Sequence, residues 1–255
     1  MHPSRRSVLT VPLAAALGAA TLGGTSATAS GAPQQSPVDI RTRDLVRGRR
    51  LPPLHVRYDH HAQVSLAYVT RDAGSPDGCL VRDVEETEQA GVEPGAGWVV
   101  VDDVRYDLLQ THFHTPSEHS VDGVRTPMEQ HLVHSSADGR LLVLAVLLQE
   151  GSEGEADRLL SVLPDECEDP VPVTDVDLRA MLPRRLSAVR YAGSLTTAPY
   201  TEGVQWFVVG TQTVSAAGIE RFREVFPEGD SRETQPLAGR RLVADPGAAA
   251  WLGDV

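Results

Sequence analysis

The sequence has no lysine, so all 23 of its basic residues are arginine, and with 35 acidic residues they give a formal net charge of −12. A chain this acidic is not expected to bind nucleic acid or an anionic membrane face as its main partner. Two cysteines are too few for a disulfide scaffold or a cysteine-based zinc site. Hydrophobic residues still make up 41% of the 255 residues, which excludes a wholly disordered chain.

The N-terminal 29 residues have the features of an export signal. The pair Arg5-Arg6 precedes an apolar run over 11–22, and Ala27-Thr28-Ala29 follows it, which is the order of a charged region, a short hydrophobic region and a cleavage site. The run is well short of the ~20 residues that a membrane anchor needs. The arginine pair resembles a twin-arginine signal, which implies export of a folded protein. A general secretory signal and a buried N-terminal helix are the alternatives.

Cleavage near Ala29 would leave one domain over 30–255, extracellular or in the cell envelope and without a membrane anchor. The lost segment carries two arginines and no acidic residue, so the mature chain has 21 arginines, 35 acidic residues and a net charge of −14. An oxidising setting permits a disulfide between Cys79 and Cys167, but sequence alone does not decide whether they meet. It also leaves open whether the protein is a monomer or a dimer.

Short β-prone runs separated by turn residues occupy the middle of the chain. The dipeptides Asp122-Gly123 and Asp138-Gly139 lie between such runs, which favours adjacent antiparallel strands. We therefore expect a mainly β (α+β) fold, with strands over 98–101, 106–114, 131–133, 141–148 and 206–209.

Helical patterns are few. Ser215 can cap a helix whose apolar face carries Ile219, Phe222 and Phe226, and short helices are also predicted over 155–163 and 175–182. The acidic, glycine-containing stretch 59–93 is predicted to be the most irregular part of the chain.

Five of the nine histidines fall between His112 and His134. The period of two in a strand puts His112 and His114 on one face and Phe113 on the other. A neighbouring strand that returns alongside would bring His131 next to them. Three neutral imidazoles without a fourth protein ligand suit a catalytic zinc site that keeps one position open for water. An isolated pair of this spacing is more often made of surface or core histidines.

Each of two of these histidines has a polar residue two positions before it in the sequence. Glu129 precedes His131 by two residues and Gln110 precedes His112 by two, so each shares a strand face with its histidine. A metal-bound histidine usually donates its other N–H to such an acceptor. The alternative is an ordinary polar strand face.

Five blocks of the sequence together resemble the α-class carbonic anhydrases, in the family's order over about residues 35–241. The resemblance implies a large, twisted, mostly antiparallel central sheet with a few short peripheral helices. The blocks are Gln35-Ser36-Pro37-Val38-Asp39-Ile40, Gln110-Thr111-His112-Phe113-His114-Thr115-Pro116-Ser117-Glu118-His119, Glu129-Gln130-His131-Leu132-Val133-His134, Gly193-Ser194-Leu195-Thr196-Thr197 and Gln235-Pro236-Leu237.

The resemblance also implies an activity, the zinc-dependent, reversible hydration of CO2 to bicarbonate and a proton. Thr196 would accept a hydrogen bond from zinc-bound hydroxide and pass its own proton to Glu118, and Thr197 would help to place bicarbonate. In carbonic anhydrases zinc lowers the pKa of its bound water to about 7. Implied roles are zinc ligation for His112, His114 and His131, support of these ligands for Gln110 and Glu129, structural roles for His119 and His134, and an apolar wall for CO2 made by Val133, Val143, Leu195, Val204 and Trp206.

Several departures from the family pattern bear on rate. Glu86 stands where the family has its proton-shuttle histidine, and an ordinary carboxylate, with a pKa about two units below that of imidazole, is a poorer relay near neutral pH. His60 and His61 are candidate substitutes, with plain surface positions as the alternative. Asp230 replaces a usual asparagine, which is expected to loosen the metal site, and Tyr200 stands where bacterial relatives often have a cysteine. Few residues separate the predicted cleavage site from Gln35, so one edge of the site is expected to be open.

The sequence therefore predicts an exported carbonate dehydratase, a zinc lyase, with weakened intramolecular proton transfer. The alternative from another class is a non-catalytic binding or structural module of the same fold. Such family members typically lack a zinc histidine, and this chain lacks none. Ester hydrolysis remains a side activity, because nothing in the predicted pocket favours a large ester.

Overall fold

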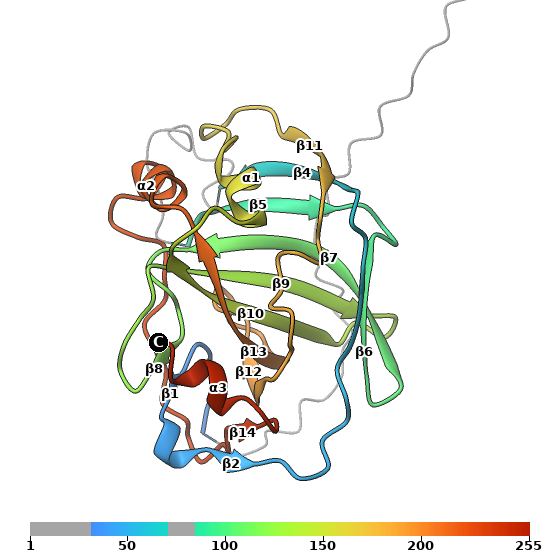
Figure 1. Cartoon of the computed structure of the whole chain (residues 1–255), viewed down its shortest axis with the longest axis vertical. Coiled ribbons are helices and arrows are strands. Elements are labelled where there is room, and N and C mark those ends of the chain that lie inside the picture. Colours follow the sequence, from blue (N-terminus) through green and yellow to red (C-terminus); the bar gives the residue numbers. More distant parts are fainter. Residues whose placement is uncertain (1–31, 71–84) are drawn as a thin grey trace, which may run out of the picture. The chain divides into compact units, whose positions relative to one another are not determined.

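The computed structural model describes residues 32–70 and 85–255, and one compact unit spans Pro33–Val255. Within the described residues twelve strands form one twisted sheet, and β1 and β8 form a separate parallel pair (Figure 1). Neighbouring strands of the large sheet are antiparallel except in the pairs β10–β13 and β14–β2. The predicted mainly β fold is thus confirmed. The proposed export signal and Cys79 lie outside the described residues.

The order of strands in the large sheet is β11-β4-β5-β7-β9-β10-β13-β12-β14-β2, and β3 joins it through β6, which pairs with β7. The elements in chain order are β1 (Asp39–Ile40), η1 (Thr42–Asp44), β2 (Val46–Arg47), β3 (His55–Tyr58), β4 (Ala62–Val69), β5 (Thr87–Val92), β6 (Gly97–Val101), β7 (Val104–His114), β8 (Ser120–Val121), β9 (Met128–Ser136), β10 (Leu141–Glu150), α1 (Glu155–Leu160), β11 (Val171–Val176), β12 (Val189–Ser194), β13 (Glu202–Val214), α2 (Ala216–Val225), β14 (Val243–Ala244) and α3 (Ala249–Leu252).

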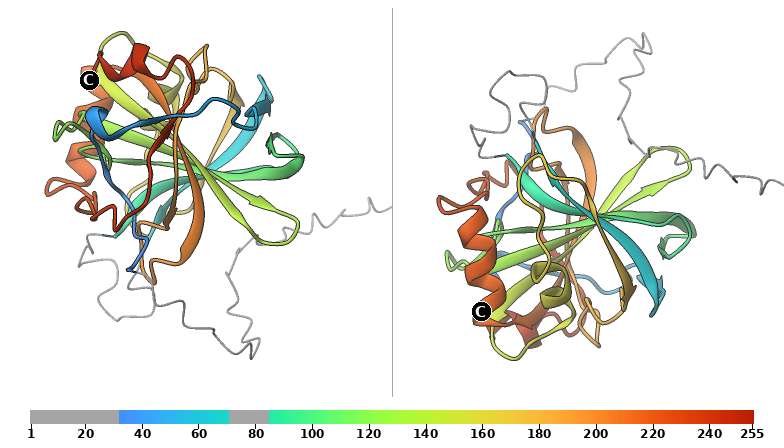
Figure 2. Two further views of the ribbon diagram at one scale, coloured as in Figure 1. Left: turned by 90° about the horizontal axis from the view of Figure 1, so that it is seen from below. Right: turned by 90° about the horizontal axis from the view of Figure 1, so that it is seen from above.

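The central strands are buried on both faces, because successive residues of β10 pack into two different cores. Leu144 belongs to a core that also holds Phe113 of β7 and Phe222 of α2, so α2 covers this face of the sheet (Figure 2). Val143 belongs to a second core on the opposite face, which we call the site-side core, together with Trp206 of β13. Successive side chains of a strand point to opposite faces of the sheet, and this alternation alone assigns neighbouring residues to different cores.

Helix α2 begins as predicted. The Ser215 side chain accepts a hydrogen bond from the Gly218 N–H at 3.0 Å, which satisfies a backbone donor of the first turn. Ile219 and Phe222 are buried on the inner side of the helix, and the Phe222 ring meets the Phe113 ring edge-on at 6.3 Å between centroids.

Three local predictions are wrong or incomplete. The helix predicted over 155–163 ends at Leu160. The range 175–182 is not helical, because its start belongs to β11, whose backbone pairs with β4; pairing with a neighbouring strand outweighs a weak local preference for helix. The stretch 59–93 holds the paired strands β4 and β5 in its described parts, while 71–84 lie outside the described residues.

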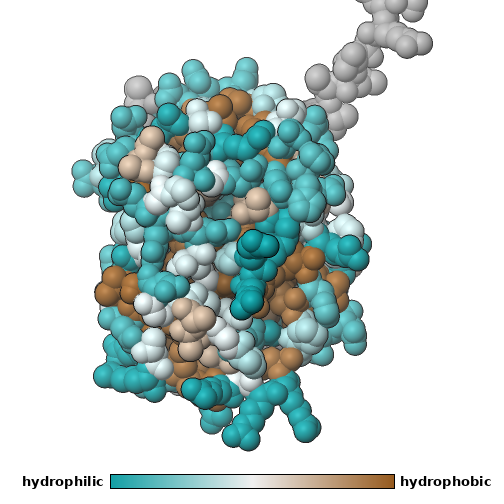
Figure 3. Space-filling view, in the orientation of Figure 1, coloured by the Kyte–Doolittle hydropathy of each residue, from teal (hydrophilic) through white to brown (hydrophobic). Residues whose placement is uncertain are grey.

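The surface seen in Figure 3 is mainly hydrophilic, with smaller hydrophobic areas between the polar ones. In residues 32–70 and 85–255, no helix combines the length and the apolar character needed to cross a membrane. Cys167 is disulfide-bonded, and Cys79, the only other cysteine of the chain, is not among the described residues.

Candidate active site

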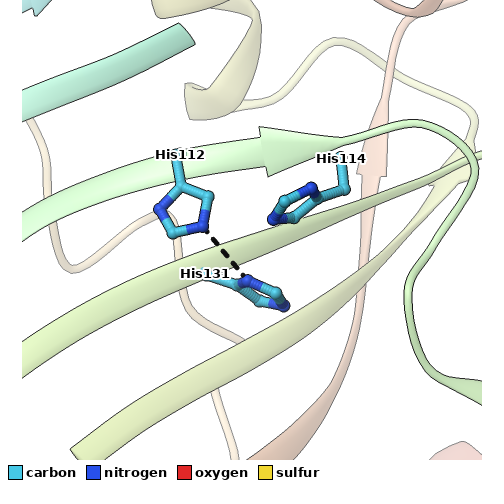
Figure 4. A group of neighbouring side chains, drawn as sticks. All are labelled: His112, His114 and His131. Atoms are coloured by element: carbon cyan, nitrogen blue, oxygen red, sulfur yellow. Dashed lines mark hydrogen bonds between the residues drawn. The ribbon is translucent and has the colours of Figure 1, made fainter. Parts of the chain in front are cut away.

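Strand pairing brings the three histidines together. His112 of β7 lies directly opposite His131 of β9, and His114 follows two residues later on the same face of β7. Figure 4 shows the three rings converging between the two strands. One ring nitrogen from each lies within 4.8 Å of the others, so the group could hold a metal ion. Phe113 points to the opposite core, as the alternation requires.

The outer nitrogen of each ring faces an acceptor. His112 Nδ1 lies 2.8 Å from Gln110 Oε1, His131 Nε2 lies 2.8 Å from Glu129 Oε1, and His114 Nδ1 lies 3.3 Å from the Asp230 carbonyl oxygen. We assign the ring proton to each of these nitrogens, because an oxygen that only accepts requires a donor. In the neutral form of each ring, the form that binds a metal, the inner nitrogen then presents a lone pair.

These inner nitrogens point towards one another. His112 Nε2 and His131 Nδ1 are 3.3 Å apart, and the buried His114 Nε2 has no hydrogen-bond partner among the described residues. Converging lone pairs repel unless a cation lies between them. Three neutral imidazoles with oriented outer nitrogens are a donor set that zinc accepts in catalytic sites, so the residues present fit this metal.

Buried carboxylates make the pocket favourable to positive charge. Burial by itself would lower the pKa of His114, but Glu118 and Asp230 outweigh it and raise this pKa to about 10. Burial would raise the pKa of Glu129, yet contacts with His119 and His131 hold it well below its usual value. Glu118 Oε2 and Asp230 Oδ2 are buried and lack hydrogen-bond partners within the described residues. A divalent cation would balance this negative charge.

A second cluster, made of His119, Glu129 and His131, has the composition of a metal site but not its chemistry. His119 Nδ1 lies 2.6 Å from Glu129 Oε1, and its Nε2 lies 2.7 Å from the Tyr191 hydroxyl. Both ring nitrogens of His119 are therefore engaged, and Glu129 orients two imidazoles through the same oxygen, Oε1, while its Oε2 accepts a hydrogen bond from the His119 backbone N–H. This geometry is that of a support behind His131 rather than of a second ion site.

The predicted apolar wall lies beside His131 in the site-side core. Val143 pairs with Val133 of β9 on one side and with Trp206 of β13 on the other. The Trp206 and His131 ring centroids are 4.9 Å apart. Val204 is buried in the same core, and Leu195 packs against it.

Thr196 and Thr197 lie in the loop between β12 and β13, and Thr196 is buried. Glu118 is buried too; its Oε1 accepts a hydrogen bond from the Arg232 N–H at 2.9 Å, and its Oε2 lies 3.7 Å from His114 Nε2. No hydrogen bond joins Thr196 to Glu118 in the described part of the chain, so that contact stays a prediction.

Comparison with known proteins decides which family has this arrangement. The family model described as eukaryotic-type carbonic anhydrase matches residues 23–245. The chain belongs to the α-carbonic anhydrase family. A carbonic anhydrase of Pectobacterium carotovorum is 34% identical over 201 residues, which cover 77% of this chain and 80% of that protein. One of Neisseria gonorrhoeae is 34% identical over 211 residues, covering 82% of this chain and 76% of its own.

Solved structures agree. The α-carbonic anhydrase of Thermovibrio ammonificans, in complex with the inhibitor sulfanilamide, matches with a TM-score of 0.71 at 33% identity, covering 82% of this chain and 86% of that chain. Family and fold support CO2 hydration, and the chain is an enzyme of the carbonate dehydratase type. The family is generally zinc-dependent, and the histidine group described above could hold the metal.

The residues expected to matter where this chain departs from the α-carbonic anhydrase pattern differ in burial and in their contacts. Glu86 is wholly buried and accepts a hydrogen bond from the Tyr68 hydroxyl at 2.8 Å, which does not suit a relay that must exchange protons with solvent. His60 and His61 are exposed, and their Nδ1 atoms lie 3.0 Å from Asp177 Oδ2 and 2.6 Å from Asp175 Oδ1. Asp230 Oδ1 accepts a hydrogen bond from the Thr115 N–H at 2.8 Å, and the loosening of the metal site stays a prediction.

The position of His61 along the sheet also separates it from the site. It precedes β4, and Ala67 of that strand is in line with Gln89 of β5 and His112 of β7. At about 3.3 Å per residue, six residues of strand correspond to about 20 Å.

Sequence reasoning missed four residues that hold this carbonic anhydrase site. Tyr191 contacts His119, Arg232 contacts Glu118, and Ser36 accepts a hydrogen bond from the Tyr191 hydroxyl at 2.9 Å. Glu85 contacts the loop that carries Thr196. These contacts join segments far apart in the chain, and only the matched blocks around Ser36 gave any signal for them.

Proposed function

We propose that this carbonic anhydrase binds one zinc ion through Nε2 of His112, Nε2 of His114 and Nδ1 of His131, and hydrates CO2 there. The observation that carries the proposal is the convergence of these three nitrogens while the outer nitrogen of each ring faces an oxygen acceptor. When bound, zinc supplies the Lewis-acid chemistry that makes water a usable nucleophile near neutral pH.

The residues around the histidines orient the reaction. Gln110, Glu129 and the Asp230 carbonyl keep the ring protons on the outer nitrogens. Thr196 accepts a hydrogen bond from the attacking oxygen and donates one from its own hydroxyl to Glu118 Oε2, a buried oxygen that has no hydrogen-bond partner among the described residues. This chain of donors leaves one lone pair of the attacking oxygen to face the carbon of CO2.

Substrate and product differ in charge, and the site has a place for each. CO2 carries no net charge and rests on the wall formed by Val133, Val143 and Trp206, where dispersion and water exclusion bind it weakly. Thr197 offers a hydroxyl to the anionic product. Because both CO2 and bicarbonate are bound weakly, bicarbonate can leave.

Intramolecular proton transfer is proposed to be the slow part of the cycle. Glu86 is buried, and His60 and His61 are distant from the three histidines along the sheet. None of the three relay candidates therefore connects the histidine site to solvent by a short path. We expect external imidazole buffer to raise kcat several-fold while kcat/KM for CO2 changes little. A kcat independent of buffer concentration would show that an internal relay is present.

The zinc assignment is tested on purified protein. Wild type should contain one zinc per chain by elemental analysis and hydrate CO2 in stopped-flow assays, and His114→Ala should lose metal and activity together. His55→Ala, at an exposed position of β3, is the matched control and should keep both. Zinc-loaded wild type without hydration above the buffer rate would refute the enzyme and favour a binding module.

Export is a separate proposal that rests on residues 1–29. Expression in a bacterium with a twin-arginine pathway should give an extracytoplasmic protein whose mature N-terminus lies near Ser30, as read by Edman sequencing. Replacement of Arg5 and Arg6 by Lys should block export if the twin-arginine route is used, and export that continues would favour the general secretory route.

A further inference from the structure

The loop from Leu195 to Thr201 carries Thr196 and Thr197 and has a strained residue near its end. Tyr200 has a φ of 57°, a left-handed backbone conformation that bulky side chains rarely adopt. Within the loop, the Tyr200 N–H donates to the Thr197 carbonyl at 2.9 Å and the Leu195 N–H donates to the Thr201 carbonyl at 2.9 Å. A strained conformation persists only where the surroundings hold it, so the contacts around Tyr200 matter.

Within the described residues, three segments far apart in the sequence contact this tyrosine. Glu85 Oε1 accepts a hydrogen bond from the Tyr200 hydroxyl, and Glu85 Oε2 accepts from the Ala198 N–H at 3.0 Å. The Arg232 guanidinium carbon lies 3.8 Å from the centroid of the Tyr200 ring. Gln35 Nε2 donates to the Tyr200 carbonyl at 3.2 Å. Hydroxyl, ring and carbonyl are thus each engaged by a different part of the chain.

Arg232 connects this cluster to the other side of the site. Its backbone N–H donates to Glu118 Oε1 at 2.9 Å, and its guanidinium donates to Gln35 Oε1 at 3.0 Å and to the Ser36 carbonyl at 2.6 Å. Thr196 stands four residues before Tyr200 on the loop. The proposed donor and acceptor of the key proton, Thr196 and Glu118, are therefore held by one cluster.

We propose that Tyr200 is a positioning residue that, with Glu85 and Arg232, keeps Thr196 and Glu118 in register for CO2 hydration. The inference rests on the proposed roles of Thr196 and Glu118. These contacts are non-covalent. The hydrogen bond from the Tyr200 hydroxyl to Glu85 and the Arg232 guanidinium over the ring hold a backbone conformation that Tyr200 alone would not keep.

The test compares Tyr200→Phe, which removes the hydroxyl but keeps the ring under Arg232, with Glu85→Ala and Glu85→Gln. Tyr68→Phe is the matched control, because it removes a hydrogen bond from a tyrosine hydroxyl to Glu86, the residue after Glu85, and leaves the contacts of Tyr200 with Glu85 and Arg232 in place. Zinc content and Tm are measured for every variant, so a folding defect is recognised directly.

Two measurements test whether Tyr200, Glu85 and Arg232 hold the loop and position Thr196. Amide hydrogen exchange in the peptide spanning 195–201 should accelerate in Tyr200→Phe and Glu85→Ala, but not in Tyr68→Phe. In the same two variants kcat/KM for CO2 should fall about 10-fold, whereas kcat at low buffer, limited by proton transfer, should fall less. Glu85→Gln keeps an amide oxygen for the Ala198 N–H and should recover most of the loss.

The outcomes are distinguishable. Unchanged exchange in Tyr200→Phe and Glu85→Ala would show that the cluster does not hold the loop. Faster exchange with unchanged kcat/KM would show that it holds the loop without positioning anything, and this also overturns the proposal. An inactive but zinc-loaded wild type would instead refute the proposed function, before any variant is compared.

Discussion

His134 leads to a quantitative prediction for acid stability. Its ring is wholly buried on β9, with Nδ1 3.2 Å from the Leu142 carbonyl oxygen and Nε2 2.5 Å from the Tyr58 hydroxyl. A neutral ring satisfies both contacts, because Nδ1–H donates and Nε2 accepts. Protonation would bring a charge into the core and leave the Tyr58 hydroxyl without its acceptor. Burial therefore lowers the pKa of His134 from 6.5 to about 4.

The sign and size of the effect follow from the two pKa values. The unfolded chain takes up a proton at this histidine below about pH 6.5, whereas the folded chain resists protonation until about pH 4. The stability gained from a neutral His134 is thus fully present above pH 6.5 and is lost as the pH falls towards 4. Between pH 7.5 and pH 4.5 the loss amounts to about 2–3 kcal/mol in the free energy of unfolding.

Urea unfolding of wild type and His134→Gln across this pH range measures the effect. Excess chelator in all samples removes any contribution of zinc binding. Wild type should lose about 2–3 kcal/mol more than the variant on going from pH 7.5 to pH 4.5. His55→Gln, at an exposed position, shows how much the loss of any histidine changes the curve. Curves for wild type and His134→Gln that stay parallel would refute the reasoning.

Three further predictions concern the site and the core. Glu129→Gln should weaken zinc binding about 10- to 100-fold in a chelator competition, because a neutral amide orients His131 less strongly; an unchanged affinity would contradict the role of this carboxylate. Thr196→Ala should keep its zinc but lower kcat/KM for CO2 about 100-fold, the usual effect of losing one oriented hydrogen bond in a transition state, and wild-type kinetics would exclude the role given to its hydroxyl. Phe113→Ala should cost about 3–5 kcal/mol in urea unfolding, because the ring is wholly buried against α2. Leu109→Ala, whose side chain is exposed on the same strand, is its control and should cost far less.

Local periodicity made part of the site predictable. The alternation of His112, Phe113 and His114 places two imidazoles on one face of any strand, whatever the rest of the fold does. The helix after Ser215 was found for the same reason, since a cap and an apolar face are properties of neighbouring residues. The range 175–182 shows the limit of such reasoning: its start became a strand because β4 offered a partner, and no local pattern reports a distant partner.

The sequence alone determined the family, through blocks whose residues are close together in the chain. The family in turn implied the mostly antiparallel sheet and the candidate zinc ligands. Only the tertiary structure decided which nitrogen of each imidazole faces the others, that Glu86 is buried, and that Tyr200 contacts both Glu85 and Arg232. The physical reason is distance along the chain. Arg232 bonds to Gln35 across 197 positions, and a contact of that kind exists only after the sheet has brought the two segments together.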